Sequence, residues 1–100
     1  MTTNEAVRKL HMVRGEIDAV DRSLVGLMAD RLELAREARL LKDQGELMYE
    51  DPAREAAVVR RAAETARELE LDPEIIRDVF WRLIALSKSA HSRDPGVGAG

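Results

Sequence analysis

The chain has 100 residues, the length of a single domain, and carries 16 Lys and Arg against 19 Asp and Glu. A net charge of −3 excludes a protein whose main partner is a nucleic-acid backbone, and the absence of cysteine excludes disulfides, thiol catalysis and cysteine-based zinc sites. With His11 and His91 as the two histidines, a histidine-rich metal site is excluded too. No apolar run approaches the roughly 20 residues of a membrane span, and the start lacks a signal-peptide pattern, so we expect a cytoplasmic protein with no membrane partner.

The composition favours helices over sheets. Hydrophobic residues make up 45% of the chain but aromatic residues only 3%, and the apolar set is mostly Ala and Leu. Ala, Leu, Glu and Arg lose the least free energy on entering a helix. We therefore predict an all-α protein with three helices per chain.

The first predicted helix is long, runs to about Lys42 and carries a heptad pattern. Such a pattern over four heptads is typical of a helix that pairs with another helix. Every position in it is apolar except Arg31. The two rows are Leu10, Ile17, Leu24, Arg31 and Ala38, and Val13, Val20, Leu27, Leu34 and Leu41.

Two Asp-Pro pairs mark the starts of the other helices. Asp51-Pro52 and Asp72-Pro73 each read as an N-cap followed by proline at the first helical position. They predict a loop over Asp43–Glu50 and helices near 52–70 and 73–91. The apolar stripes are Val59, Ala62, Ala66 and Leu69, and Ile76, Val79, Phe80, Leu83 and Ile84. Residues 1–92 are the predicted domain, and we expect the Gly-rich 93–100 to form a disordered tail.

The length of the first helix predicts a dimer. From Asn4 to Lys42 a helix spans roughly 58 Å, at about 1.5 Å per residue. A compact domain of this size has a radius of gyration of about 13 Å. Two shorter helices cannot cover the whole apolar seam, so we predict an interlocked homodimer with the long helices antiparallel.

Each predicted helix places polar groups on its inward face. Extending the stripes brings in Arg31, Glu55 beside Arg54, and Ser87 with His91. Since unpaired buried charge costs several kcal/mol, these groups should share a pocket or bind a ligand. Arg14 and Lys42 flank the same seam but lie about 42 Å apart along one helix. If the partner helix crosses near residue 22, Arg14 of one chain lies level with Arg31 of the other.

This set of residues suits a small dicarboxylate. Arg14, Arg31, Lys42 and Arg54 against Glu55 give a net charge of +3, and arginine binds carboxylates in a planar, bidentate way. Glu55 could accept a hydrogen bond from a ligand hydroxyl.

Each residue also has a structural interpretation. Arg31 could specify the register of a coiled coil, and Arg54 with Glu55 could be a solvated pair. Ser87 could bond back to its own helix, and His91 could interact with a helix dipole. The joint appearance of these residues on three inward faces favours the site.

The pattern resembles the all-helical chorismate mutase family over about residues 10 to 91. The residues that carry the resemblance are Arg14-Gly-Glu-Ile-Asp-Ala-Val-Asp21, Leu24, Leu27, Asp30-Arg31, Lys42, Asp51-Pro-Ala-Arg54-Glu55, Phe80 and Ser87. The resemblance implies an intertwined dimer with two sites that convert chorismate to prephenate by a unimolecular rearrangement, without a cofactor or metal.

The resemblance also implies a role for each site residue. Arg14 of the partner and Arg31 would bind the carboxylates of the substrate, with Ser87 near one of them. Lys42 would hold a carboxylate and the ether oxygen. The ring hydroxyl would be bound by the backbone of Asp51 and by Glu55, and Arg54 would line the pocket.

His91 departs from the family pattern, which has Gln or Glu at this position. A histidine can donate a hydrogen bond to the ether oxygen as imidazolium or as the neutral tautomer with its N–H pointing inward. We therefore expect Lys42, Arg31 and His91 to be the catalytic residues.

Two groups of alternatives stay open from the sequence. Related enzymes on this scaffold use isochorismate, or aminodeoxychorismate, in which an amine replaces the ring hydroxyl. A non-catalytic helical dimer that acts as an interaction module would use the same seam for pairing. It predicts that the polar residues need not converge and that Arg31→Leu stabilises the protein without consequence.

Overall fold

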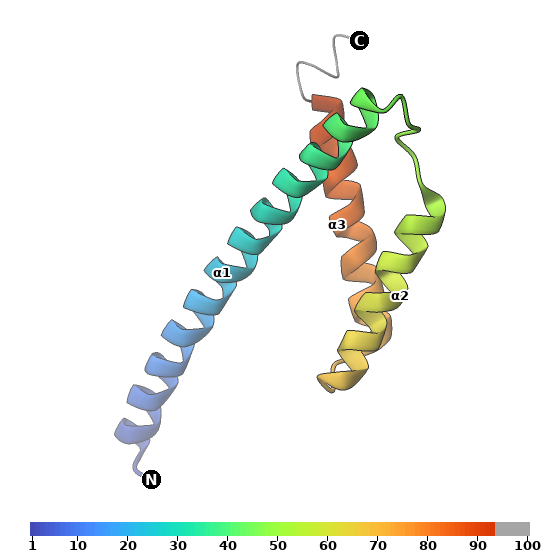
Figure 1. Ribbon diagram of the computed structural model, residues 1–100. Helices are drawn as coiled ribbons and strands as arrows, with labels where there is room; N and C mark the ends of the chain where they lie inside the picture. The colour runs from blue at the N-terminus through green and yellow to red at the C-terminus, as the bar shows by residue number, and fades with distance from the viewer. Residues whose placement is uncertain (94–100) are drawn as a thin grey trace. The chain divides into compact units, whose positions relative to one another are not determined.

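The computed structural model describes residues 1–93, and the side chains of residues 1–90. It contains three helices: α1 (Thr3–Gln44), α2 (Pro52–Glu68) and α3 (Pro73–Arg93) (Figure 1). No strand occurs in this described part, so the all-α prediction is confirmed. The three helices end within two residues of the predicted positions, a difference that lies within the usual uncertainty of helix ends. The predicted tail falls largely on residues outside the described range.

The chain divides after Arg31 into two units, and each is described by itself. The first unit is the N-terminal part of α1. Thr2 caps this helix, because its Oγ1 accepts a hydrogen bond from the Glu5 N–H at 3.2 Å and its carbonyl accepts one from Ala6 at 3.0 Å. No residue of α1 is buried. The apolar heptad residues of this unit are all exposed, including Ile17 at 52% and Leu27 at 63%.

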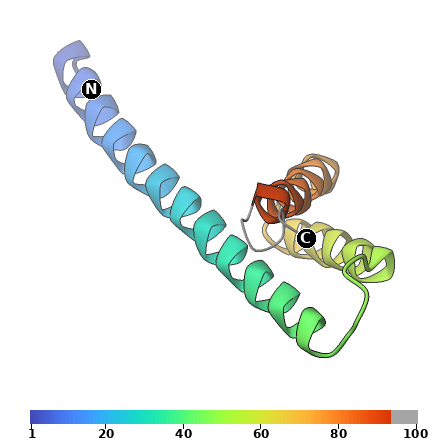
Figure 2. The ribbon, with the colours of Figure 1, turned by 90° about the horizontal axis from the view of Figure 1, so that it is seen from above.

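The second unit begins at Leu32 and contains the end of α1, the following loop, α2 and α3. Here α2 and α3 lie side by side as an antiparallel pair, as both views of the ribbon show (Figure 1, Figure 2). Their buried core is small and made mainly of alanine, which lets the two helices approach closely. It consists of Val59, Ala62, Ala63, Ala66 and Ile84.

The predicted stripes of α2 and α3 are correct in most positions. Ile76, Phe80 and Leu83 are half-buried along α3. Leu69 is an exception: it is exposed because it is the C-cap residue of α2, where the helix has already ended, and Ala63 is buried instead. Val79 is also exposed.

Both predicted N-caps are confirmed. Oδ1 of Asp51 accepts a hydrogen bond from the Arg54 N–H at 3.0 Å. Oδ1 of Asp72 accepts one from the Glu74 N–H at 2.9 Å. Pro52 and Pro73 occupy the first helical positions, where no N–H is needed. Among the described residues, no helix is both long and apolar enough to cross a bilayer.

Candidate functional site

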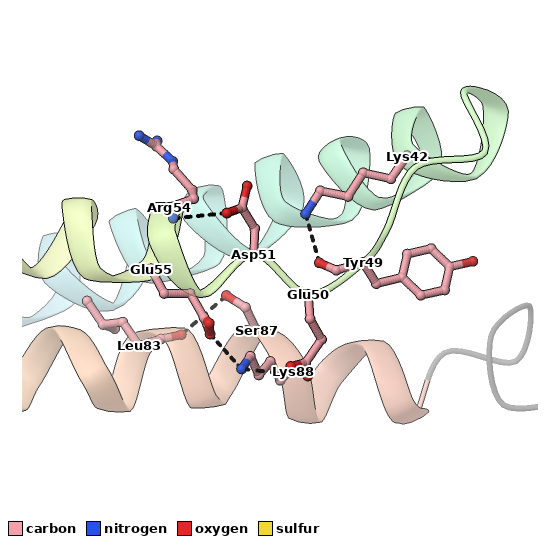
Figure 3. A network of polar contacts seen from close by, with 9 residues as sticks. All are labelled: Lys42, Tyr49, Glu50, Asp51, Arg54, Glu55, Leu83, Ser87 and Lys88. Carbon is pink, nitrogen blue, oxygen red and sulfur yellow. Dashed lines mark hydrogen bonds and ion pairs between the residues drawn. The ribbon is translucent and has the colours of Figure 1, made fainter.

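At the start of α2, the side chains of two adjacent predicted site residues point in different directions. The Asp51 cap fixes the first turn of the helix, and Arg54 and Glu55 follow on this turn. Successive residues of a helix point about 100° apart, since one turn takes about 3.6 residues. The Arg54 side chain is accordingly exposed and points away from α3, whereas the Glu55 side chain points toward α3 (Figure 3).

Glu55 is held by a lysine of α3. The Oε1 atom of Glu55 lies 2.6 Å from Nζ of Lys88, and Oε1 of Glu50 lies 4.0 Å from the same nitrogen. The Glu55 side chain is 18% exposed and that of Lys88 54% exposed. The hydrogen bond with Glu55 raises the pKa of Lys88, against a smaller lowering by desolvation, and the charges of Glu55 and Glu50 add to the rise. Lys88 is therefore protonated when it contacts Glu55 at neutral pH.

Ser87 directly precedes Lys88 in α3. Its hydroxyl is half-buried and donates a hydrogen bond to the carbonyl of Leu83 at 3.2 Å, one turn earlier (Figure 3). This is the back-bond to its own helix that the structural interpretation of Ser87 predicts.

The end of α1 and the loop hold Lys42 near the start of α2. Nζ of Lys42 donates a hydrogen bond to the carbonyl of Tyr49 at 3.0 Å, and the side chain is half-buried. The guanidinium carbon of Arg39 lies 3.8 Å from the centre of the Tyr49 ring, a cation–π contact. The loop that leads to Asp51 is thereby fixed to the last turns of α1 (Figure 3).

The second unit contains five of the predicted site residues, but the Arg54 side chain points away from α3. Lys42 contacts the Tyr49 carbonyl, and the backbone continues from Tyr49 to Asp51. Glu50, which lies between them, and Glu55 both contact Lys88. The five are Lys42, Asp51, Arg54, Glu55 and Ser87 (Figure 3).

Of the other three predicted residues, two belong to the first unit and one has no described side chain. Arg14 and Arg31 belong to the first unit, where Arg14 is exposed and Arg31 is half-buried. The side chain of His91 lies outside the described residues.

Lys88, Glu50 and Tyr49 are the residues that sequence reasoning missed. A signal for Lys88 existed, because a step of four residues from Ile84 reaches position 88 on the inward stripe of α3. Lys88 adds a positive charge that the sequence-based charge sum left out. The Glu55 carboxylate therefore forms an ion pair before any ligand binds. Among the described side chains, no group of three or more His, Asp or Glu residues could hold a metal ion.

Comparison with known proteins gives a consistent result. The family model for chorismate mutase type II matches residues 13–92. The chain is 34% identical over 86 residues to a T-protein of Enterobacter agglomerans, and 34% identical over 84 residues to a T-protein of Haemophilus influenzae. These matches cover 86% and 84% of this chain but only 23% and 22% of the two T-proteins, so the chain spans less than a quarter of their length.

A shorter relative matches along most of its length. The chain is 30% identical over 83 residues to a chorismate mutase of Methanocaldococcus jannaschii, which covers 83% of this chain and 84% of that protein. No solved structure was found to match. The family match extends over four fifths of the chain and includes the whole cluster around Glu55. The chain belongs to the chorismate mutase type II family.

Proposed function

We propose that the chain is a chorismate mutase, which rearranges chorismate to prephenate in the synthesis of aromatic amino acids. The observation that carries the proposal is the match to chorismate mutase type II over residues 13–92, within which the cations and the glutamate described above occur at the expected spacings. The archaeal relative that covers most of the chain is named a chorismate mutase. We further propose that residues 1–92 form the catalytic domain and that it acts in the cytoplasm.

The reaction explains the kind of residues in the cluster. One C–O bond breaks as one C–C bond forms within a single molecule, so the reaction uses neither a nucleophile nor a cofactor. The protein must hold the enolpyruvyl arm over the ring, which is a positioning effect. It must also stabilise the negative charge that grows on the ether oxygen, with donors placed beforehand. Arginine and lysine side chains supply both effects.

Lys42 is proposed to hold a substrate carboxylate and the ether oxygen. An ammonium has three N–H donors, and Lys42 gives one of them to the Tyr49 carbonyl. Two donors are then left for the two substrate oxygens. The hydrogen bond to Tyr49 supports this role because it limits the rotation of the ammonium before the substrate binds.

The hydroxyl end of the ring is assigned to the start of α2. Glu55 would accept the hydrogen bond of the hydroxyl, and the backbone of Asp51 would bind it from the other side. Arg54 would line the pocket, and Ser87 would lie near a carboxylate. The cap at Asp51 and the ion pair of Glu55 support the assignment, since both fix these groups in place.

We infer that the functional form is a homodimer in which Arg14 reaches the site of the partner chain. The apolar heptad residues of α1 are exposed in the single chain, which is a costly arrangement unless another helix covers them. Arg31 of the same chain would bind the second carboxylate.

His91 is proposed to donate a hydrogen bond to the ether oxygen in place of the glutamine that the family uses. Glutamine can donate the same bond from its amide. We expect His91→Gln to keep turnover within about threefold of wild type and His91→Ala to lower kcat by about 10²-fold or more, the usual loss for one such donor. If both variants turn over chorismate at the wild-type rate, His91 has no catalytic role.

The proposed function is tested by following the ultraviolet absorbance of chorismate with purified protein and identifying the product. Loss of chorismate with formation of prephenate is expected. Conversion of isochorismate or aminodeoxychorismate in its place would assign the chain to a related reaction on the same scaffold. If none of the three compounds is consumed, the chain is an interaction module.

A further inference from the structure

We propose that Lys88 determines substrate specificity: by pairing with Glu55 it makes the site select a ring hydroxyl over a ring ammonium at the same position. The inference rests on the proposed function and extends it to the choice between chorismate and its 4-amino analogue. The juxtaposition that carries it is the contact between the first turn of α2 and the C-terminal part of α3 (Figure 3).

The contact is short, and its two partners differ in exposure. Nζ of Lys88 lies 2.6 Å from Oε1 of Glu55, within the range of a charge-assisted hydrogen bond. The Glu55 side chain is mostly covered, whereas Lys88 reaches it from a more exposed position. A carboxylate that is largely out of water depends on its protein partner for neutralisation. Lys88 provides that partner.

The ion pair leaves Glu55 able to bind a hydroxyl. A carboxylate has two oxygens with about four acceptor positions, and Lys88 occupies positions on Oε1. Oε2 can still accept one hydrogen bond from a ligand. A neutral hydroxyl donates that bond without bringing a second positive charge close to Lys88.

A ring ammonium would meet a different environment. Toward a lone carboxylate, an ammonium is a better partner than a hydroxyl, because the bond is charge-assisted. Toward the pair, the attraction by Glu55 is opposed by repulsion from the ammonium of Lys88, which contacts the same carboxylate. Lys88 thus removes the advantage that Glu55 alone would give to the amine.

The remaining carboxylate near Lys88 does not reverse this result. Glu50 lies 4.0 Å from Nζ of Lys88, but its side chain is 74% exposed. Water and salt screen a charge in that position much more than they screen Glu55. Glu50→Gln is therefore a matched control: it removes a carboxylate near Lys88 without touching Glu55.

The test compares kcat/KM for chorismate and for 4-amino-4-deoxychorismate in four proteins. Wild type is expected to prefer chorismate. Lys88→Met should move the ratio of the two kcat/KM values toward the amine by about tenfold or more, which corresponds to about 1.4 kcal/mol. Lys88→Arg keeps the charge and should keep the wild-type ratio, and Glu50→Gln should change it by less than about threefold. Lys88→Gln serves as a second neutral variant if Lys88→Met is poorly folded by circular dichroism.

The outcomes separate this inference from the proposed function. If wild type converts chorismate but the neutral variants keep its ratio, the enzyme assignment holds and the role of Lys88 is wrong. A shift in Lys88→Arg as large as in Lys88→Met would show that side-chain shape rather than charge matters, which also overturns the inference. If wild type prefers 4-amino-4-deoxychorismate, or converts neither compound, the inference is already overturned by the wild-type measurement alone.

Discussion

Lys42 illustrates how much of the proposed chemistry depends on a single side chain. Its ammonium is half-buried and oriented by the Tyr49 carbonyl, 3.0 Å away, before any substrate is present. The ring of Tyr49 is held in turn by Arg39. A donor fixed in this way can stabilise charge in a transition state without reorganising, which the proposed rearrangement requires at its ether oxygen.

We expect Lys42→Ala to lower kcat by about 10²- to 10³-fold, because one pre-placed donor to the ether oxygen contributes roughly 3–4 kcal/mol. Steady-state kinetics with chorismate measures the effect. Lys9→Ala is the matched control, since Lys9 is an exposed lysine on the same helix, and should leave kcat unchanged. Near wild-type turnover by Lys42→Ala would remove Lys42 from the catalytic residues.

At the scale of the elements, α1 and α2 end in the same way. After each helix the second residue beyond the last helical one is a glutamate with positive φ: Glu46 at 56° and Glu70 at 59°. Leu71 N–H then donates to Ala66 at 2.8 Å, and Glu70 N–H donates to Arg67 at 3.2 Å. This is the Schellman arrangement, in which the position with positive φ is usually glycine.

Glu70→Gly should therefore stabilise the protein. The left-handed conformation costs a non-glycine residue about 1–2 kcal/mol, and the greater freedom of glycine in the unfolded chain offsets up to about 1 kcal/mol of the gain. We expect a net gain of about 0.5–1 kcal/mol and a Tm higher by a few degrees. The control Glu64→Gly, on the exposed side of α2, should destabilise by about as much. A lower Tm for Glu70→Gly in thermal unfolding would contradict the argument.

The ion pair between α2 and α3 gives the stability of the protein a defined pH dependence. The folded-state pKa of Lys88 is raised above its ordinary value of 10.5 by the hydrogen bond with Glu55. The unfolded chain has no such bond, so the pair stabilises the fold fully from neutral pH up to about pH 10.5, and this contribution is lost as the pH rises through the folded-state pKa.

The expected result is that wild type exceeds Lys88→Met in stability at pH 8 and that the difference narrows as the pH rises past 10.5. Urea unfolding followed by circular dichroism at several pH values measures the difference. Because both proteins are compared at the same pH, the effects of groups that titrate alike in both cancel. A difference that stays constant from about pH 8 to about pH 12 would mean that the pair makes no contribution in solution.

The helices and their starts could be predicted from the sequence because local signals specify them. Heptad spacing, Asp-Pro pairs and composition act within a few residues of the element that they define. At the ends of α1 and α2 a glutamate rather than a glycine occupies the position of positive φ, so the usual glycine signal is missing at that position.

The candidate site was predictable in part, for a different reason. Lys42, Asp51 and Glu55 follow from the family spacing, whereas the partners that hold them depend on tertiary contacts. The Tyr49 carbonyl reaches Lys42 only once the loop has folded back, and Lys88 meets Glu55 only once α2 and α3 pair. The stripe of α3 can place Lys88 on the inward side, but its contact with Glu55 depends on the pairing of the two helices.

At the scale of the whole molecule, the exposed apolar heptad pattern of α1 is the main argument that two chains associate. A helix of 42 residues with an apolar heptad pattern and no buried residue exposes more apolar surface than a monomer of this size usually does. The core between α2 and α3 is five residues, four of them in α2, which is small for a stable domain. Both features are explained if α1 pairs with a second copy.

If the dimer forms as proposed, each site takes Lys42 from one chain and Arg14 from the other. Arg14→Ala and Lys42→Ala should then each be inactive alone but complement each other when the two chains are co-expressed. In a mixed dimer one site carries both substitutions and the other carries neither. Random pairing makes about half of the dimers mixed, so the mixture should recover about a quarter of the wild-type activity per chain.

The control for this experiment is a mixture of Arg31→Ala and Lys42→Ala. Both residues are proposed to act in the site of their own chain, so every site of a mixed dimer lacks one of them and no activity should return. Recovery in the first mixture and not in the second would assign Arg14 to the partner's site. If neither mixture recovers although light scattering shows dimers at twice the chain mass of 11.2 kDa and differently tagged chains co-purify, Arg14 does not complete the partner's site and the crossed arrangement is wrong.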